Sequence, residues 1–119
     1  IDAVAAIPLH ESKLRKRGYN QSEFFAEGIC SRLNIPNQSK YLIRKKATET
    51  QTKKSRFERW KNVDQIFALT DRSVFENRHI LLVDDVITTG ATIEACAQTI
   101  IRTQNCKVSV ASIAIASLN

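Results

Sequence analysis

The sequence predicts an α/β domain with a mostly parallel sheet flanked by helices, because candidate strands and helices alternate along the chain. Residues 80–83 are four consecutive apolar residues rich in Leu and β-branched side chains, typical of a strand covered on both faces. Residues 92–104 then place apolar side chains at the i, i+3, i+4, i+7 spacing of an amphipathic helix. Residues 107–115 are a second apolar, β-branched run, which predicts the next strand.

The N-terminal half shows the same alternation. Residues 3–9 form a short apolar run interrupted by Pro8, which predicts a buried strand. Residues 10–21 are polar and basic and predict a loop. Residues 22–33 predict a helix with Ser22 or Asn20 as its N-cap. Its helical spacing brings together four side chains: Phe25, Ile29, Arg32 and Leu33.

The remaining elements are shorter or less regular. We expect short strands at residues 41–43 and 63–69 and the buried strand at residues 79–87. The segment between the two short strands shows no clear apolar period, so we predict a basic flexible loop at about 44–62 with some helical tendency. We expect residues 1–119 to form one domain, since the chain is long enough for a single core.

Composition excludes several protein classes. The chain is 43% apolar and 25% charged, so it is not a disordered chain. It has no signal peptide pattern and no run of about 18 apolar residues, so we expect no membrane insertion. Cys30, Cys96 and Cys106 form no CxxC pair, which predicts buried free thiols in a cytoplasmic protein. Because the sequence contains no Met, we expect the natural protein to extend N-terminally.

The positive charge is concentrated in one segment. The net charge of the chain is +6, and residues 44–61 alone carry eight basic and two acidic side chains. Such a segment favours an anionic partner, either a nucleic acid or a small phosphorylated ligand. The alternative is a solvated loop without a partner.

The most informative stretch follows the buried strand at residues 80–83. Two adjacent carboxylates, Asp84 and Asp85, precede a Thr/Gly turn at residues 88–92 that opens a helix. The free N–H groups of a helix N-terminus bind phosphate, and Gly90 permits a close or left-handed backbone. Carboxylates beside a phosphate suit ribose hydroxyls or a hydrated Mg²⁺. The pattern therefore predicts a ligand of the ribose 5-phosphate type. Paired acids after a strand also occur in receiver domains, but no Asp follows Asp85 to accept a phosphate.

Residues 80–92 resemble the signature of the type I phosphoribosyltransferases at every position: four apolar residues, two acids, two apolar residues and T-T-G-x-T. The resemblance implies that Asp84 and Asp85 contact the ribose hydroxyls of phosphoribosyl pyrophosphate (PRPP). It also implies a type I phosphoribosyltransferase-like fold. The residues that it assigns to the 5-phosphate are Thr88, Thr89, Gly90, Ala91 and Thr92.

The rest of the chain resembles the competence protein F (ComF/GntX-like) family. Pro8-Leu9-His10 and the run LRKRGYNQ at residues 14–21 match its P-L-H and R-x-R-G-[FY]-N-Q stretches. Lys54 departs from the family, which has an apolar residue there, and the family's N-terminal zinc-binding segment is absent from this sequence. The family spacing also matches in the middle of the chain, at Arg44, Thr48, Gln51, Ser55, Glu58, Arg59, Asn62 and Val63.

Phosphoribosyl transfer passes through an oxocarbenium-like state at C1 of the ribose while pyrophosphate leaves. It needs cations over the leaving group and exclusion of water. We therefore expect Mg²⁺, held indirectly by Asp84 and Asp85, and a catalytic Arg59 in a basic segment that closes over the site. The expected pyrophosphate ligands, whose alternative is plain surface charge, are Lys13, Arg15, Lys16 and Arg17.

A second function class stays open. The ComF/GntX-like family is associated with DNA uptake during natural competence, so the domain could bind PRPP without catalysis and act with a DNA-translocating partner. The basic segment could also contact single-stranded DNA directly, with Trp60 either stacking on a base or packing as the segment closes. The sequence does not identify the acceptor, which is nucleobase-like or an amine, or the oligomeric state.

Overall fold

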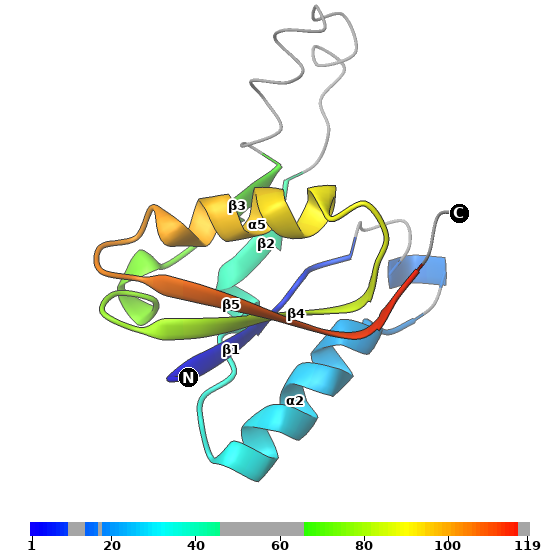
Figure 1. Ribbon diagram of the computed structural model, residues 1–119, viewed down its shortest axis with the longest axis horizontal. Coiled ribbons are helices and arrows are strands. Elements are labelled where there is room, and N and C mark those ends of the chain that lie inside the picture. The colour runs from blue at the N-terminus through cyan, green and yellow to red at the C-terminus, as the bar shows by residue number, and fades with distance from the viewer. Residues whose placement is uncertain (10–13, 17, 46–65, 117–119) are drawn as a thin grey trace, which may run out of the picture.

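The computed structural model describes residues 1–9, 14–16, 18–45 and 66–116 (Figure 1). Its main sheet has the strand order β1-β4-β5, and both neighbouring pairs are parallel. The sheet confirms the predicted parallel α/β architecture. Its three strands are β1 (Ala3–Ala6), β4 (His79–Ile87) and β5 (Lys107–Ile115).

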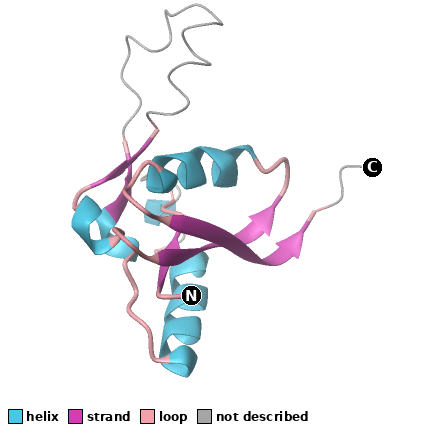
Figure 2. Ribbon diagram, turned by 60° about the vertical axis from the view of Figure 1, so that its left-hand side comes forward, coloured by secondary structure: helices cyan, strands magenta, loops and turns pink. Residues whose placement is uncertain are grey.

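One helix covers each face of this sheet, as Figures 1 and 2 show for α2 (Gln21–Leu33) and α5 (Ala91–Ile101). Successive strand side chains point to opposite faces, so β1 contributes to two separate cores. Ala3 and Ala5 pack in the core on the α5 side, whereas Val4 and Ala6 pack in the core on the α2 side. Because both faces are covered, the central strand β4 is buried at Ile80, Leu82 and Val83.

A small second sheet packs on the α5 side. It pairs β2 (Leu42–Arg44) with β3 (Phe67–Leu69) in antiparallel register, with Arg44 opposite Phe67. Leu42 and Phe67 are buried in the same core as α5. Two short 3-10 turns, η1 (Ser39–Tyr41) and η3 (Arg72–Val74), precede β2 and β4. The sequence predicted the two short strands but not that they pair with each other.

The outer edge of β1 is covered by the chain that follows α2. The N–H of Val4 donates to the carbonyl of Pro36 at 3.0 Å, and the N–H of Gln38 donates to the carbonyl of Val4 at 2.7 Å. The buried Ser39 hydroxyl accepts from the N–H of Ala6 at 2.9 Å. These bonds satisfy the backbone of a strand that would otherwise present an open edge.

The hydrogen bonds at the start of α2 show which of the two predicted residues is the N-cap. Asn20 is the cap, because its side chain accepts from the N–H of Ser22, and the helix ends at Asn34 in the left-handed conformation. Of the side chains in the predicted spacing, Phe25 and Ile29 are partly buried, whereas Leu33 is 58% exposed, so the spacing does not define one fully buried face. The buried side chains of α2 are the small ones, Ser22 and Ala26, since the helix lies close to the sheet.

Several predicted boundaries need correction. Residues 14–16 are helical within the predicted loop, and Arg44 belongs to β2 instead of the basic segment. Helix α5 ends at Ile101 instead of residue 104. Residues 46–65, which include most of the basic segment, lie outside the described residues.

All three cysteines are free thiols, as predicted. Cys96 and Cys106 are buried, whereas Cys30 is only partly buried, so the expectation of three buried thiols is wrong for Cys30. Among the described residues, no helix is both long enough and apolar enough to cross a membrane.

Candidate functional site

Those predicted ligand-binding residues that the structure describes lie where the chain leaves β1 and β4. Figure 1 shows three segments at this end of the sheet: the turn from β4 to α5, the helical residues 14–16, and the N-terminus of α2. In parallel α/β sheets, ligands bind in the crevice at the carboxyl ends of the strands. This end of the molecule is therefore the candidate functional site.

Asp84 and Asp85 both lie inside β4, which continues to Ile87. One carboxyl oxygen of Asp84, Oδ1, accepts from the N–H of Asp85 at 2.9 Å and from the Ser22 hydroxyl at 3.5 Å. Oδ1 of Asp85 accepts from the N–H of Val86 at 2.8 Å. The two carboxyl groups follow the buried part of the strand, and each accepts a hydrogen bond from the backbone N–H of the next residue.

The environment of Asp84 favours its protonated form. Burial, followed by the neighbouring Asp85 carboxyl group, raises the pKa of Asp84 from 3.8 to about 6, although the N–H of Asp85 and the Ser22 hydroxyl act in the opposite direction. A carboxyl group with a raised pKa in a surface pocket is typical of a functional site. A ligand that donates hydrogen bonds to the ionised carboxylate would relieve this electrostatic cost.

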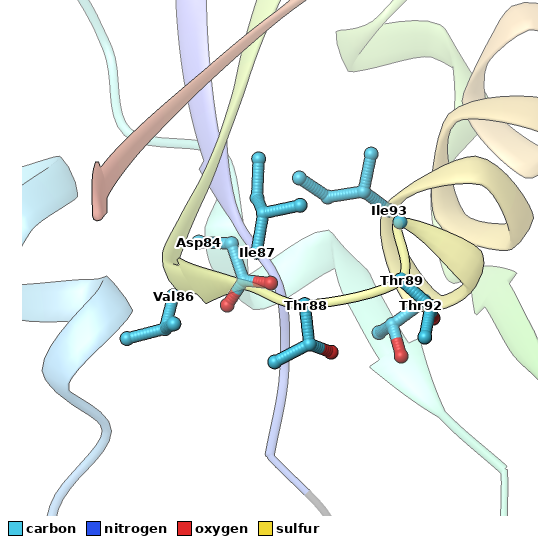
Figure 3. Close-up of a pocket in the computed structure, with 8 residues that line it drawn as sticks. Asp84, Val86, Ile87, Thr88, Thr89, Thr92 and Ile93 are labelled. Carbon is cyan, nitrogen blue, oxygen red and sulfur yellow. The ribbon is translucent and has the colours of Figure 1, made fainter. Parts of the chain in front are cut away.

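Beside Asp84, the turn into α5 forms a small pocket of about 50 Å³. Glu94 donates the first hydrogen bond within the helix, to the carbonyl of Gly90 at 2.9 Å. The N–H groups of Thr92 and Ile93 precede it, so they have no carbonyl of α5 to pair with. Such N–H groups and the positive end of the helix dipole favour an anion. The pocket is lined by Asp84, Val86, Ile87, Thr88, Thr89, Gly90, Thr92 and Ile93 (Figure 3).

Gly90 sets the direction of this turn. It is the N-cap residue of α5 and has a φ of 84°, in the left-handed region that favours glycine. Its neighbours supply the side-chain oxygens: the Thr89 hydroxyl accepts from the N–H of Ala91 at 3.3 Å, and Thr88 and Thr92 are exposed. Figure 3 shows Thr88 near the Asp84 carboxyl group, with Thr89 and Thr92 toward α5. The predicted phosphate-binding residues thus comprise the turn at residues 88–90 and the first two residues of α5, and all of them except Ala91 line the pocket.

Only part of the predicted cation set can be placed. Arg15 and Lys16 are exposed, and the short helical segment 14–16 that contains them lies between β1 and α2 at the site's end of the sheet (Figure 1). Lys13, Arg17 and Arg59 lie outside the described residues, as do His10 and Trp60. His79 begins β4, at the opposite end of the strand, where its Nε2 is 2.7 Å from the Ser109 hydroxyl. The roles of all these cations stay predictions.

The site contains one residue whose contact the sequence did not predict. Ser22 was considered only as a helix cap, but its hydroxyl reaches Asp84 across 62 positions of sequence. The buried Cys96 also lies near Asp84, whose charge contributes to a thiol pKa of about 12, although burial is the main cause. Cys96 is therefore a packing residue and not a nucleophile.

The phosphoribosyl transferase domain family matches residues 20–118 of the chain. Competence protein F of Haemophilus influenzae is 37% identical over 93 residues, which are 77% of this chain and 41% of that protein. The DNA utilization protein YhgH of Escherichia coli is 33% identical over 101 residues, 85% of this chain and 44% of that protein. The chain thus spans less than half the length of these relatives.

A solved structure shares the fold. The glutamine PRPP amidotransferase from B. subtilis, complexed with ADP and GMP, superimposes with a TM-score of 0.67 over 94% of this chain and 22% of its own, at 22% sequence identity. That likeness supports the type I phosphoribosyltransferase fold. Together with the family match, it excludes the receiver-domain alternative.

Gly90 and Gly28 together provide a test of the turn, because Gly90 has a positive φ and Gly28 lies inside helix α2. An added Cβ would meet nothing within 4 Å at Gly90 or at Gly28, so any effect is conformational. We expect Gly90→Ala to destabilise the protein by about 1–2 kcal/mol because of its positive φ. Gly28→Ala lies inside α2 and should stabilise it by about 0.5–1 kcal/mol. Chemical denaturation of both variants checks this, and stabilisation by Gly90→Ala would contradict the assigned turn.

The Asp84 carboxyl group should weaken the fold at neutral pH. Its pKa is raised on folding from 3.8 to about 6, so the folded protein holds this proton more tightly than the unfolded chain. Stability should therefore fall as the pH rises from about 4 to about 6. We expect Asp84→Asn to flatten this part of the pH profile and to stabilise the protein at pH 7 by about 1 kcal/mol, a value already reduced for solvent screening.

Thermal unfolding between pH 4 and pH 8 measures this effect. Glu76→Gln is the matched control, because it removes one negative charge from an exposed side chain in the turn before β4. A loss of stability in Asp84→Asn at pH 7, with an unchanged control, would show that the ionised carboxylate stabilises the fold instead.

Proposed function

The chain belongs to the phosphoribosyl transferase domain family as a ComF-like type I member, and from this we propose that its site binds PRPP with Mg²⁺ and transfers the ribose 5-phosphate to an acceptor. One observation carries the proposal. Asp84, which Asp85 follows in β4, lines the same small pocket as the turn at the start of α5, within one short segment of chain. A phosphate and the hydroxyl groups of a sugar are the chemistry that suits these two neighbours.

In the proposed complex, the 5-phosphate occupies the turn at residues 88–92. The N–H groups of Thr92 and Ile93 and the Thr hydroxyls donate to its oxygens. The ribose 2- and 3-hydroxyls donate to the carboxylates of Asp84 and Asp85. These bonds favour the ionised form of Asp84, so ligand binding lowers the pKa that burial raised.

The carboxyl pair fits Mg²⁺ as an ion shared with the substrate. Within the described part of the chain, no group of three or more His, Cys, Asp or Glu side chains could hold a metal alone. Mg²⁺ typically keeps several waters and binds through one or two carboxylates together with substrate phosphates. When bound, it neutralises charge on the leaving pyrophosphate. Asp84 and Asp85 would hold it indirectly, through water or the ribose hydroxyls.

Transfer breaks the bond between C1 of the ribose and the pyrophosphate oxygen, and the acceptor forms the new bond to C1. The carboxylates hold the ribose while positive charge develops at its ring, as in glycosyl transfer generally. Arg15 and Lys16 are the described cations that precede α2 at this end of the sheet, and we assign them to the pyrophosphate. Lys13, Arg17 and Arg59 complete the proposed set from positions outside the described residues.

Titration calorimetry with PRPP, with and without Mg²⁺, tests the proposal. We expect binding that requires Mg²⁺ and that weakens at least tenfold in Asp85→Asn, since a hydrogen bond to a charged group contributes about 1.5–3 kcal/mol. Glu76→Gln again serves as the charge-matched control and should bind like the wild type. A folded wild-type protein that does not bind PRPP in the presence of Mg²⁺ would refute the proposed function.

The names of two relatives favour a second candidate function. One is a competence protein and the other a DNA utilization protein. We therefore also propose an accessory role in DNA uptake, in which the basic residues 44–61 contact single-stranded DNA or the domain acts with a DNA-translocating partner.

For either function we propose a location in the reducing cytoplasm. The free thiols at Cys30, Cys96 and Cys106 support this location.

Direct binding to DNA would show a characteristic dependence of affinity on salt concentration. Binding of a single-stranded oligonucleotide should weaken steeply as salt rises, because each cation that neutralises a phosphate releases counterions. The double variant Lys53→Ala/Lys54→Ala should reduce the slope of log K against log salt by about 1.4. Asp85→Asn should leave DNA binding unchanged. Absence of binding at low salt, measured by fluorescence anisotropy, would exclude direct DNA contact.

A further inference from the structure

A ring of hydrogen bonds, closed by one long and partly buried contact, lies at the base of Asp84. The N–H of Ile7 donates to the carbonyl of Val83, the residue before Asp84, at 3.0 Å. The side-chain amide of Asn20 donates to the carbonyl of Ile7 at 3.1 Å. Its other side-chain atom, Oδ1, accepts from the N–H of Ser22 at 3.0 Å. The Ser22 hydroxyl then returns to Oδ1 of Asp84 at 3.5 Å.

Asn20 is the only residue of this ring that contributes two side-chain bonds. It is 8% exposed, and its neighbours Ile7 and Ser22 are 4% and 2% exposed, so water competes little for these bonds. One bond reaches the chain leaving β1, and the other caps the start of α2. Asn20 therefore joins the carboxyl end of β1 to the helix N-terminus that approaches Asp84.

We propose that Asn20 is a positioning residue for the PRPP site, which sets Ser22 and hence Asp84 in place. The inference rests on the proposed function and deepens it. Helix capping alone does not require the side-chain NH₂ group of Asn20, because Ser and Asp, which lack this group, cap helices about equally well. The bond to Ile7 is the part that ties the helix to the sheet.

Because the amide nitrogen of Asn20 bonds to Ile7 and its oxygen caps α2, a substitution can remove the first bond and keep the second. Asn20→Ser keeps a cap acceptor but is too short to reach the carbonyl of Ile7, so it breaks the ring. Ser22→Ala keeps the capped N–H and removes only the long contact to Asp84. Ser39→Ala is the matched control. This variant removes a buried hydrogen bond from the N–H of Ala6 in β1 to the Ser39 hydroxyl, and Ser39 is not part of the ring.

We expect Asn20→Ser to weaken Mg²⁺-dependent PRPP binding about tenfold and Ser22→Ala about threefold, measured by calorimetry well below the unfolding temperature. Ser39→Ala should lower the unfolding temperature without changing this affinity. Because Asn20 acts through Asp84, the losses of Asn20→Ser and Asp84→Asn should be less than additive in the double variant. Wild-type affinity in a folded Asn20→Ser protein, or an equal loss in Ser39→Ala, would overturn the inference.

An NMR measurement separates this inference from the proposed function. The backbone amide signals of Asp84 and Asp85 should shift in Asn20→Ser and Ser22→Ala, and less in Ser39→Ala, in the absence of any ligand. If the wild type does not bind PRPP, the proposed function fails, and these shifts alone decide whether Asn20 positions Asp84. Unchanged Asp84 and Asp85 signals in Asn20→Ser would refute the positioning role in either case. If Asn20→Ser does not fold, Ser22→Ala carries the same test.

Discussion

The structure depends on the burial of β4 between two parallel neighbours. β1 and β5 pair with it from either side, and a helix covers each face. Parallel pairing brings the carboxyl ends of the strands to one edge, where the two helices begin. Burial along β4 stops at Val83, and the carboxyl group of Asp84 follows directly. The parallel sheet therefore brings the two acids of β4 and the N-termini of α2 and α5 to the same edge.

Asp84 is not the residue that stability alone would select at this edge. Burial raises its pKa to about 6, so its ionised form costs free energy in the folded state, and functional sites commonly carry such costs. Gly90, by contrast, suits its left-handed conformation, which other residues avoid. The bonds of Asn20 to Ile7 and Ser22 act against the cost at Asp84, because they satisfy buried polar groups around Asp84. The site is thus a locally unfavourable arrangement held by a rigid surrounding.

The predictable part of the site is the part that is local in sequence. The strand, acids, turn and helix of residues 80–92 follow one another directly, so periodicity and turn chemistry locate them. The contact of Ser22 with Asp84 spans 62 positions, and no local pattern indicates it. The pairing of β2 with β3 and the exposure of Leu33 were missed for the same reason, since tertiary packing decides them. The roles of the individual site residues stay predictions.

The described ends of the basic segment relate it to the site. Arg44 pairs with Phe67, and the N–H of Lys45 donates to the carbonyl of Ile66 at 2.7 Å, so the chain leaves and re-enters the fold at one point. Burial raises the pKa of Cys96, and two charges modify that shift: Asp84 raises it further, while Arg44 lowers it. Both charged groups therefore lie within electrostatic reach of one buried thiol. The basic segment is therefore attached beside α5, because β2 and β3 pack in the same core as this helix, and the N-terminus of α5 lines the pocket that contains Asp84.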